Sequence, residues 1–386
     1  MLIQFACKVM LLFCFLFGLL PPIASSSTPK IEAQAAILVD AKTGQILYEK
    51  NSHIRNAPAS TTKVLTAIIA IESGQLDEEV KVSSRAAHTA GSSMHLSTGQ
   101  LISMRELVIG LLLRSGNDAA VAIAEHLAGS VENFVTLMND KAQLLDATNS
   151  HFANPHGLTA VNHYSTAFDL AWIARYALTN PTFSTIVNTK ETNIEWLDRK
   201  GKEHDQTLKN TNKLLWLLEE ADGVKTGTTN QAGPCLISSA TRGNQRLIAV
   251  VLHDHSRWYD SMQLLKYGFD SFELYEYANK DDVIASIPVE EGLGPIIDAV
   301  ISANASLVVP TADYEHVTVS VNLPEKIKAP VYQGQKIGEV VFFVRQQAVK
   351  TIDITSAQTI DERTYTKTLL HYLLHTFRLF SSWGVF

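Results

Sequence analysis

Residues 57–70 read APASTTKVLTAIIA, and their only charged residue is Lys63. Apart from Lys63 the stretch is apolar or hydroxylic, which predicts a buried helix that begins at Ser60 and ends before Gly74. Residues three apart on a helix share a face, with Cβ atoms about 5–6 Å apart, so Ser60 and Lys63 are expected to touch. Serine needs an adjacent base to act as a nucleophile, and apolar burial favours the neutral amine that can serve as that base.

The S-x-x-K pattern also occurs by chance. In the alternative interpretation, Ser60 only begins a capped helix, and Lys63 points into solvent. Two further motifs favour the catalytic interpretation. Ser115-Gly116-Asn117 separates two apolar helical segments, although alone it is typical of a turn with an N-cap. Lys225-Thr226-Gly227 begins a strand-like segment, where glycine lets a ligand backbone approach the sheet edge. The same tripeptide at 42–44 lies in an expected hairpin turn, so we assign the cleft to the later copy.

The composition predicts a folded chain of two or three domains. Of its 386 residues, 46% are hydrophobic and 18% are charged, which is enough apolar surface for large cores. The net charge is −7, and no basic stripe interleaved with aromatic residues is present, so we exclude nucleic acid as a partner.

Residues 1–27 have the layout of a secretory signal. Lys8 precedes an apolar run from Val9 to Leu20, and small residues follow up to Ser26. An uncleaved membrane anchor is the alternative, which the short apolar run disfavours. Of the three cysteines, Cys7 and Cys14 lie within this segment. The mature chain would therefore keep only Cys235 and could form no internal disulfide.

Strand and helix patterns predict an α/β catalytic domain over residues 28–277. A β-rich hairpin comes first, helices fill the middle, and strand-like runs return after Asp222 before a last helix. We therefore expect an antiparallel sheet in which early and late strands are neighbours, together with a helical lobe. Residues 278–362 alternate in polarity, with Pro and Gly between the runs, and predict a small all-β domain.

Residues 363–386 predict an amphipathic helix that lies on a membrane surface. At about 100° per residue, polar side chains form one narrow face and apolar side chains fill the rest. The polar face consists of Lys367, His371, His375, Arg378 and Ser382, and the apolar face includes Leu369, Leu373, Phe377 and Phe380. Packing of this helix on another domain is the alternative.

The motifs S-x-x-K, S-x-N and K-T-G, in this order, are typical of penicillin-binding proteins and β-lactamases. With the flanking stretches ILVDAKTGQILYEKN, LLRSGNDAAVAIAEHLAGS and NPHGL, the chain resembles the low-molecular-mass penicillin-binding proteins, D-alanyl-D-alanine carboxypeptidases of the S11 serine peptidases. The resemblance implies a transpeptidase/β-lactamase-like fold and removal of the terminal D-alanine from peptidoglycan pentapeptides, with no cofactor and no metal. It also implies inhibition by β-lactams, export to the outer face of the cytoplasmic membrane, and a role in cell-wall synthesis and cell shape.

The resemblance further implies a role for each catalytic motif residue. Ser60 would be the acylated nucleophile and Lys63 its general base. Asn117 would orient both the substrate amide and Lys63. Ser115 and Lys225 would pass a proton to the leaving D-alanine.

A second set of residues would bind the substrate. Thr226, Gly227 and Thr228 would line the strand that receives the peptide, and the N–H groups of Ser60 and Thr228 would form the oxyanion hole. Arg257 would pair with the terminal carboxylate, because a guanidinium binds a carboxylate in bidentate fashion.

Three other functions compete with this one. A class A β-lactamase adds a glutamate in an E-x-x-L-N segment, and the nearest candidate, Glu195–Asp198, does not fit. A catalytically silent receptor or cell-wall-binding module would be acylated without turnover, and the intact trio argues against it. A metalloenzyme would need ligands that His253-Asp254-His255 and the pair His371 and His375 do not supply at a known spacing.

Overall fold

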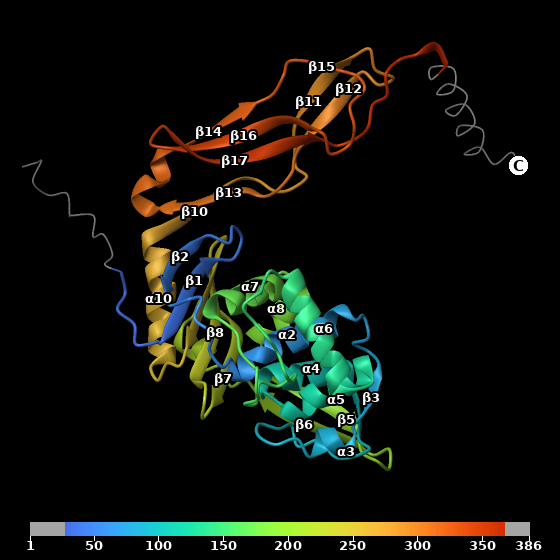
Figure 1. Ribbon diagram of the computed structural model, residues 1–386, viewed down its shortest axis with the longest axis vertical. Helices are drawn as coiled ribbons and strands as arrows, with labels where there is room; N and C mark the ends of the chain where they lie inside the picture. The colour runs from blue at the N-terminus through green and yellow to red at the C-terminus, as the bar shows by residue number, and fades with distance from the viewer. Residues whose placement is uncertain (1–27, 367–386) are drawn as a thin grey trace, which may run out of the picture.

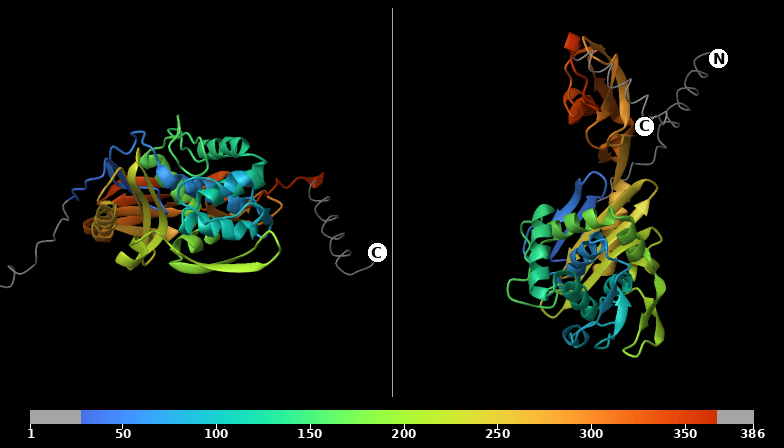
Figure 2. Two further views of the ribbon diagram at one scale, coloured as in Figure 1. Left: turned by 90° about the horizontal axis from the view of Figure 1, so that it is seen from below. Right: turned by 90° about the vertical axis from the view of Figure 1, so that its right-hand side faces the viewer.

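The computed structural model describes residues 28–366 (Figure 1). The expected secretory signal at residues 1–27 lies outside the described residues, and so does the expected amphipathic helix from residue 367 onward. The described chain forms an α/β domain and a β domain that extends from one end of it (Figures 1 and 2).

The α/β domain is built on an antiparallel sheet with the strand order β2-β1-β9-β8-β7. The strands are β1 (Ala35–Asp40), β2 (Ile46–Lys50), β7 (Ala221–Thr229), β8 (Gly233–Arg242) and β9 (Gln245–Leu252). Early and late strands pair directly, with Ala36 of β1 opposite Val251 of β9. The predicted sheet of sequence-distant neighbours is therefore confirmed, and β7 forms one of its edges.

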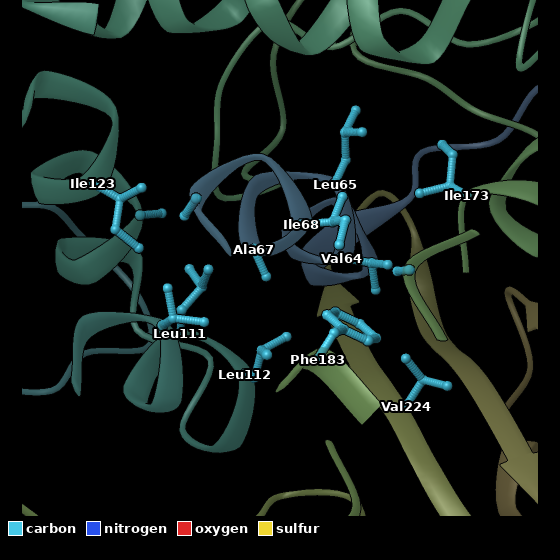
Figure 3. Packing of buried hydrophobic residues seen from close by; sticks show 14 of the residues in the cluster. Val64, Leu65, Ala67, Ile68, Leu111, Leu112, Ile123, Ile173, Phe183 and Val224 are labelled. Carbon is cyan, nitrogen blue, oxygen red and sulfur yellow. The ribbon is translucent and has the colours of Figure 1, made fainter. Parts of the chain in front are cut away.

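The helical lobe covers one face of this sheet (Figure 1). Its main helices are α2 (Lys63–Glu72), α4 (Met104–Leu113), α5 (Asn117–Ala128), α6 (Val131–Leu144), α7 (Ala167–Leu178) and α8 (Pro181–Asn188). A helix that is apolar on all sides must be enclosed, and α2 packs against α4, α5, α6, α7 and α8. Figure 3 shows Ala67 of α2 facing Leu111 and Leu112, whereas Leu65 points away on the opposite side of the helix.

The helix α10 (Arg257–Ser271) covers the opposite face of the sheet. Successive side chains of a strand point to opposite faces. In β1, Ile37 therefore packs into the helical lobe, whereas Leu38 packs into the cluster that contains Leu264 and Leu265 of α10. Both faces of the sheet are buried, so a peptide can reach it at an edge.

A smaller sheet in the helical lobe was not predicted from the sequence. It has the order β3-β4-β5-β6 and consists of β3 (Glu79–Lys81), β4 (Leu101–Ser103), β5 (Glu191–Leu197) and β6 (Glu203–Lys209). Short helical segments complete the domain, namely η1 (Ala59–Thr62), α3 (Ser84–Ala87) and α9 (Leu214–Leu217). The hairpin β5–β6 leads back from the helical lobe to β7.

The β domain confirms the predicted all-β architecture. Its main sheet has the order β14-β16-β17-β12-β11-β15. The elements are β11 (Val283–Glu290), β12 (Ile296–Ile301), η2 (Thr311–His316), β14 (Val317–Asn322), β15 (Ile327–Lys328), β16 (Lys336–Val344) and β17 (Gln347–Ser356). Its own core includes Ile297, Ile301, Val340, Phe342 and Ile354.

A two-stranded ribbon joins the domains (Figure 1). It pairs β10 (Phe272–Ala278), which follows α10 directly, with β13 (Ala305–Pro310). Leu274 and Val308 pack into the core beneath α10, whereas Val309 packs into the core of the β domain. The predicted domain boundary at residues 277 and 278 falls inside β10, and the division of the chain there remains a prediction.

The earlier K-T-G copy lies at this junction. Lys42 forms an ion pair with Glu276 of β10, and its Nζ donates to Asn279 Oδ1 at 3.1 Å. Arg175 of α7 donates to the carbonyl oxygens of Ala41 and Lys42 at 2.7 and 2.9 Å. This hairpin turn therefore holds β10 against the α/β domain, and its residues have a structural explanation that requires no substrate.

Candidate active site

Ser60 lies in η1, one turn before α2. The predicted helix start is thus a 3-10 turn, in which residues three apart eclipse each other, and this geometry brings Lys63 beneath Ser60. Lys63 Nζ lies 2.9 Å from Ser60 Oγ. Ser60 is half-buried and Lys63 is fully buried, so the hydroxyl can be reached from solvent while the amine cannot.

Two oxygen atoms from other segments complete the surroundings of Lys63. Asn117 Oδ1 lies 2.7 Å from Lys63 Nζ, and the backbone carbonyl oxygen of His156 lies 2.6 Å from it. The other end of the Asn117 amide donates to the carbonyl of Ala90 at 2.7 Å, which fixes the orientation of its oxygen. This contact of His156 could not be predicted from the sequence, because a backbone carbonyl leaves no mark on residue identity.

Burial and nearby positive charges lower the pKa of Lys63 and of Lys225. The pKa of Lys63 is held well below its usual value, mainly by burial and then by the positive charge of Lys225. Burial and the nearby Arg257 lower the pKa of Lys225 to about 7. A lowered pKa favours the neutral amine, which is the form that can accept a proton.

Ser115 lies in the turn between α4 and α5, next to this group. Its backbone is left-handed, with φ at 64°, and Asn117 begins α5. Ser115 Oγ is buried and has no hydrogen-bond partner among residues 28–366. Buried hydroxyls are normally satisfied, so an unpaired one close to Asn117 in the chain is available to a substrate or to a proton in transit.

The later K-T-G copy lies on the edge strand β7, beside η1. A Cβ on Gly227 would lie 2.9 Å from Ser60 N and 3.0 Å from Thr61 N. Only glycine therefore leaves space next to the N–H group of Ser60. Lys225 is 1% exposed, and its ammonium donates to the carbonyl of Thr226 at 3.1 Å.

Arg257 begins α10 and reaches over the same strand. Its Nη1 donates to the carbonyl of Gly227 and to Thr228 Oγ1, both at 2.9 Å, and to the carbonyl of Cys235 at 3.2 Å. The structure thus gathers all the predicted site residues around η1 and the end of β7. Their individual roles remain predictions.

Two buried carboxyl groups lie at the start of α10, next to Arg257. Asp260 accepts the backbone N–H groups of Glu32 and Ala33 at 2.6 and 3.1 Å, and Asp254 accepts that of Ser256 at 2.8 Å. The other oxygen of Asp254 is buried and has no hydrogen-bond partner among residues 28–366. Burial, together with the negative charge of Asp260, raises the pKa of Asp254 to about 6.

The glutamate considered for a class A β-lactamase lies in a different sheet. Glu195 lies on β5 opposite Asp205, with its backbone N–H donating to Glu106, so it belongs to the small sheet. Within residues 28–366, no cluster of three or more His, Cys, Asp or Glu side chains could hold a metal ion. The pair His371 and His375 lies outside the described residues.

Two family models match the chain. One is described as D-alanyl-D-alanine carboxypeptidase (Peptidase_S11) and matches residues 23–256. The other is described as the C-terminal domain of penicillin-binding protein 5 and matches residues 272–362.

Individual relatives agree with these models. The chain is 35% identical to the D-alanyl-D-alanine carboxypeptidase DacF of Bacillus subtilis, with 80% of this chain and 81% of DacF covered. It is 32% identical to DacD of Escherichia coli, with 91% of this chain and 92% of DacD covered. The crystal structure of penicillin-binding protein 5 from Haemophilus influenzae matches with a TM-score of 0.75 at 31% identity, covering 87% of this chain and 99% of that chain.

Gly227→Ala is expected to leave a folded protein that penicillin acylates at least about 100-fold more slowly. The added methyl would press on the backbone N–H groups of Ser60 and Thr61, and loss of one oxyanion donor costs about 10²–10³ in rate. Acylation by labelled penicillin and thermal unfolding measure the two effects. Gly294→Ala in the β domain is the control, and wild-type labelling of Gly227→Ala would refute the position of the oxyanion site.

Asp254→Asn is expected to stabilise the protein at pH 7 and not at pH 4. The pKa of this carboxyl is raised in the folded state, so the wild type loses stability as pH rises from about 4 through about 6. Asparagine carries no titrating proton, so the free energy of unfolding of the variant should exceed that of the wild type by about 1–3 kcal/mol at pH 7. Urea unfolding at both pH values tests this. The exposed Asp205→Asn is the control, and an equal effect of Asp254→Asn at both pH values would contradict the prediction.

Proposed function

We propose roles for the site residues on the premise that the chain belongs to the D-alanyl-D-alanine carboxypeptidase family. The protein is a serine-type carboxypeptidase that acts on peptidoglycan peptides ending in D-Ala-D-Ala, and it binds penicillin. Its residues perform the reaction in two steps, acylation of Ser60 and hydrolysis of the acyl-enzyme.

The environment of the Lys63 amine supports this proposal most directly. Asn117 Oδ1 and the His156 carbonyl can only accept hydrogen bonds. A neutral amine has two N–H groups, which these two acceptors occupy, so its lone pair is left facing Ser60 Oγ at 2.9 Å. Because the pKa of Lys63 is lowered, this neutral form is accessible, and Lys63 acts as the general base.

In the acylation step, Ser60 Oγ bonds to the carbonyl carbon of the penultimate D-alanine, and its proton passes to Lys63. The N–H groups of Ser60 and Thr228 donate to the oxyanion. The C–N bond then breaks, and the leaving amine receives the proton held by Lys63, which passes through the Ser115 hydroxyl. This hydroxyl is buried and has no partner among residues 28–366. Lys225 supplies a second amine to this relay.

In the deacylation step, a water molecule replaces the released D-alanine. Lys63 takes a proton from this water as the water oxygen attacks the ester carbonyl carbon. When the ester C–O bond breaks, Lys63 returns that proton to Ser60 Oγ, 2.9 Å away. The substrate peptide lies along β7, where Thr226 and Thr228 face it and Gly227 allows its close approach. Arg257 receives the terminal carboxylate, and its Nη1 is already held by Gly227 and Thr228.

Ser60→Ala and Lys63→Arg are expected to abolish covalent labelling by penicillin and the release of D-alanine from a pentapeptide. The alanine lacks the nucleophile, and the arginine stays protonated and cannot act as a base. Gel fluorescence and mass spectrometry of the peptide products measure the two activities. Lys42→Ala, in the other K-T-G copy, is the control and should retain both. Labelling of the wild type without D-alanine release would instead favour a silent binding module.

The proposal places the enzyme at the outer face of the cytoplasmic membrane. No helix within residues 28–366 is long and apolar enough to cross a membrane. The sequence of residues 367–386 has Leu369, Leu373, Phe377 and Phe380 on one predicted face and basic residues on the other. Fully buried, each such apolar side chain contributes about 1.5–3 kcal/mol, and each basic residue near anionic lipid adds about 1 kcal/mol.

Truncation after Thr364 is expected to release the signal-cleaved protein from membranes, because the apolar face that inserts into lipid is removed. The truncated protein should still bind penicillin, since every proposed site residue lies before residue 258. Membrane fractionation followed by penicillin labelling measures both properties. A truncated protein that remained with the membrane would show that another segment anchors it.

A further inference from the structure

Residues 152–163 form the loop that carries the His156 carbonyl to Lys63. The two residues that flank this loop, His151 and Tyr164, exchange both of their backbone hydrogen bonds, each at 2.9 Å. Between them, no residue belongs to a helix or a strand. The direction of the carbonyl therefore depends on side chains that hold the loop, because no regular backbone ladder does so.

The side chain of His163, the last residue of this loop, contacts both the start of the loop and η1. Its Nδ1 lies 2.9 Å from the backbone nitrogen of Ala153, and a backbone N–H can only donate. Its Nε2 lies 2.9 Å from Oγ1 of Thr62, the last residue of η1. Nδ1 is therefore the acceptor, and Nε2 carries the proton that it donates to Thr62. One imidazole thus connects the loop to the helical turn that bears Ser60.

The surroundings of His163 keep its imidazole neutral. The side chain is buried, and its ring packs edge to face with that of Phe152, with the centroids 5.8 Å apart. Burial, followed by repulsion from the cationic forms of His151 and Lys63, lowers the pKa of His163 to about 4. A second proton, on Nδ1, would also face the N–H of Ala153. At physiological pH the ring is therefore in the form that makes both hydrogen bonds.

The loop and η1 are in direct contact, so a shift between them would reach the base. A Cβ on Gly157 would lie 1.8 Å from the carbonyl oxygen of Ala59. The preceding carbonyl, that of His156, lies 2.6 Å from Lys63 Nζ. Movement of the loop relative to η1 would change this distance, and the two hydrogen bonds of His163 oppose such movement.

We propose that His163 is a positioning residue for the general base, because its neutral imidazole holds the His156 carbonyl where this oxygen orients the Lys63 amine. This inference rests on the proposed role of Lys63 in acylation. Both ring nitrogens are occupied, by Ala153 and by Thr62, so the imidazole acts through these contacts and exchanges no proton with the substrate. A misplacement of about 1 Å in a catalytic arrangement can cost about 100-fold in rate.

The test separates the two hydrogen bonds of His163. His163→Asn places an amide oxygen near the position of Nδ1 and keeps an acceptor for Ala153, whereas His163→Gln reaches Thr62 with an amide N–H. His163→Phe keeps a ring and loses both bonds. Thr62→Val removes the second bond from the other side. Phe183→Leu, a buried change in α8, is the control for lost stability.

The measurements separate binding, acylation and stability. Stopped-flow saturation with benzylpenicillin gives the dissociation constant of the noncovalent complex and the acylation rate constant. Release of D-alanine from a pentapeptide gives kcat, and thermal unfolding gives Tm. A residue with a merely structural role would lower Tm and leave the acylation rate constant of the folded protein unchanged.

His163→Phe is expected to lower the acylation rate constant and kcat by about tenfold to 100-fold, because the orientation of the base is lost. The dissociation constant should change less than about twofold, since β7 is unaltered. His163→Asn and His163→Gln should each lose less than His163→Phe. The effects of His163→Asn and Thr62→Val should not add, because both remove the same hydrogen bond. Phe183→Leu should acylate like the wild type.

Three outcomes would overturn the inference. The first is a folded His163→Phe with wild-type acylation, and the second is an equal loss of rate in Phe183→Leu at equal Tm. The third is additive effects of His163→Asn and Thr62→Val, which decides the matter even where His163→Phe does not fold. A wild type that released no D-alanine would refute the proposed function itself, and this result is seen before any variant is compared.

Discussion

The burial of the Lys63 amine is the constraint on which the rest of the site depends. A charged ammonium is costly inside a protein unless it is paired. The charge of Asp118 acts to raise the pKa of Lys63, but this carboxylate already accepts hydrogen bonds from the N–H groups of Met94 and Leu96. The neutral amine is therefore favoured, and acceptor oxygens orient it. These oxygens belong to residues 54 and 93 positions away in the sequence, so only the folded chain brings them to Lys63.

The sheet determines from which side a peptide can approach the half-buried Ser60. A five-strand layer with helices on both faces exposes backbone groups at its edges, and β7 is the edge that lies beside η1. Gly227 keeps the gap between that edge and Ser60 open. The apolar helix α2 fixes the other side of the gap, because it is enclosed by the helical lobe (Figure 3). Packing thus fixes the position of Ser60 relative to the edge of β7 before any substrate binds.

The sequence predicted those parts of the fold and the site that depend on side-chain identity. The Ser–Lys spacing, the pairing of early with late strands and the all-β domain all follow from local patterns. The role of the His156 carbonyl could not be found in this way, because a backbone oxygen has no sequence signal. The strands β3 and β4 are each only three residues long, too short for a period to emerge. The two K-T-G copies are identical in sequence, and only their surroundings distinguish them.

The ribbon β10–β13 packs into the cores of both domains and so restricts the position of the β domain more than a flexible linker would. Its two faces are buried in different cores, with Leu274 and Val308 in one and Val309 in the other. The helix α10 leads into it without a loop, and at about 1.5 Å per residue its 15 residues span about 22 Å from Arg257 to β10. Reorienting the β domain would require exposing Leu274 or breaking the contacts of Glu276 with Lys42 and Asn244. The arginine proposed to bind the carboxylate and the β domain are therefore held at the two ends of one rigid helix.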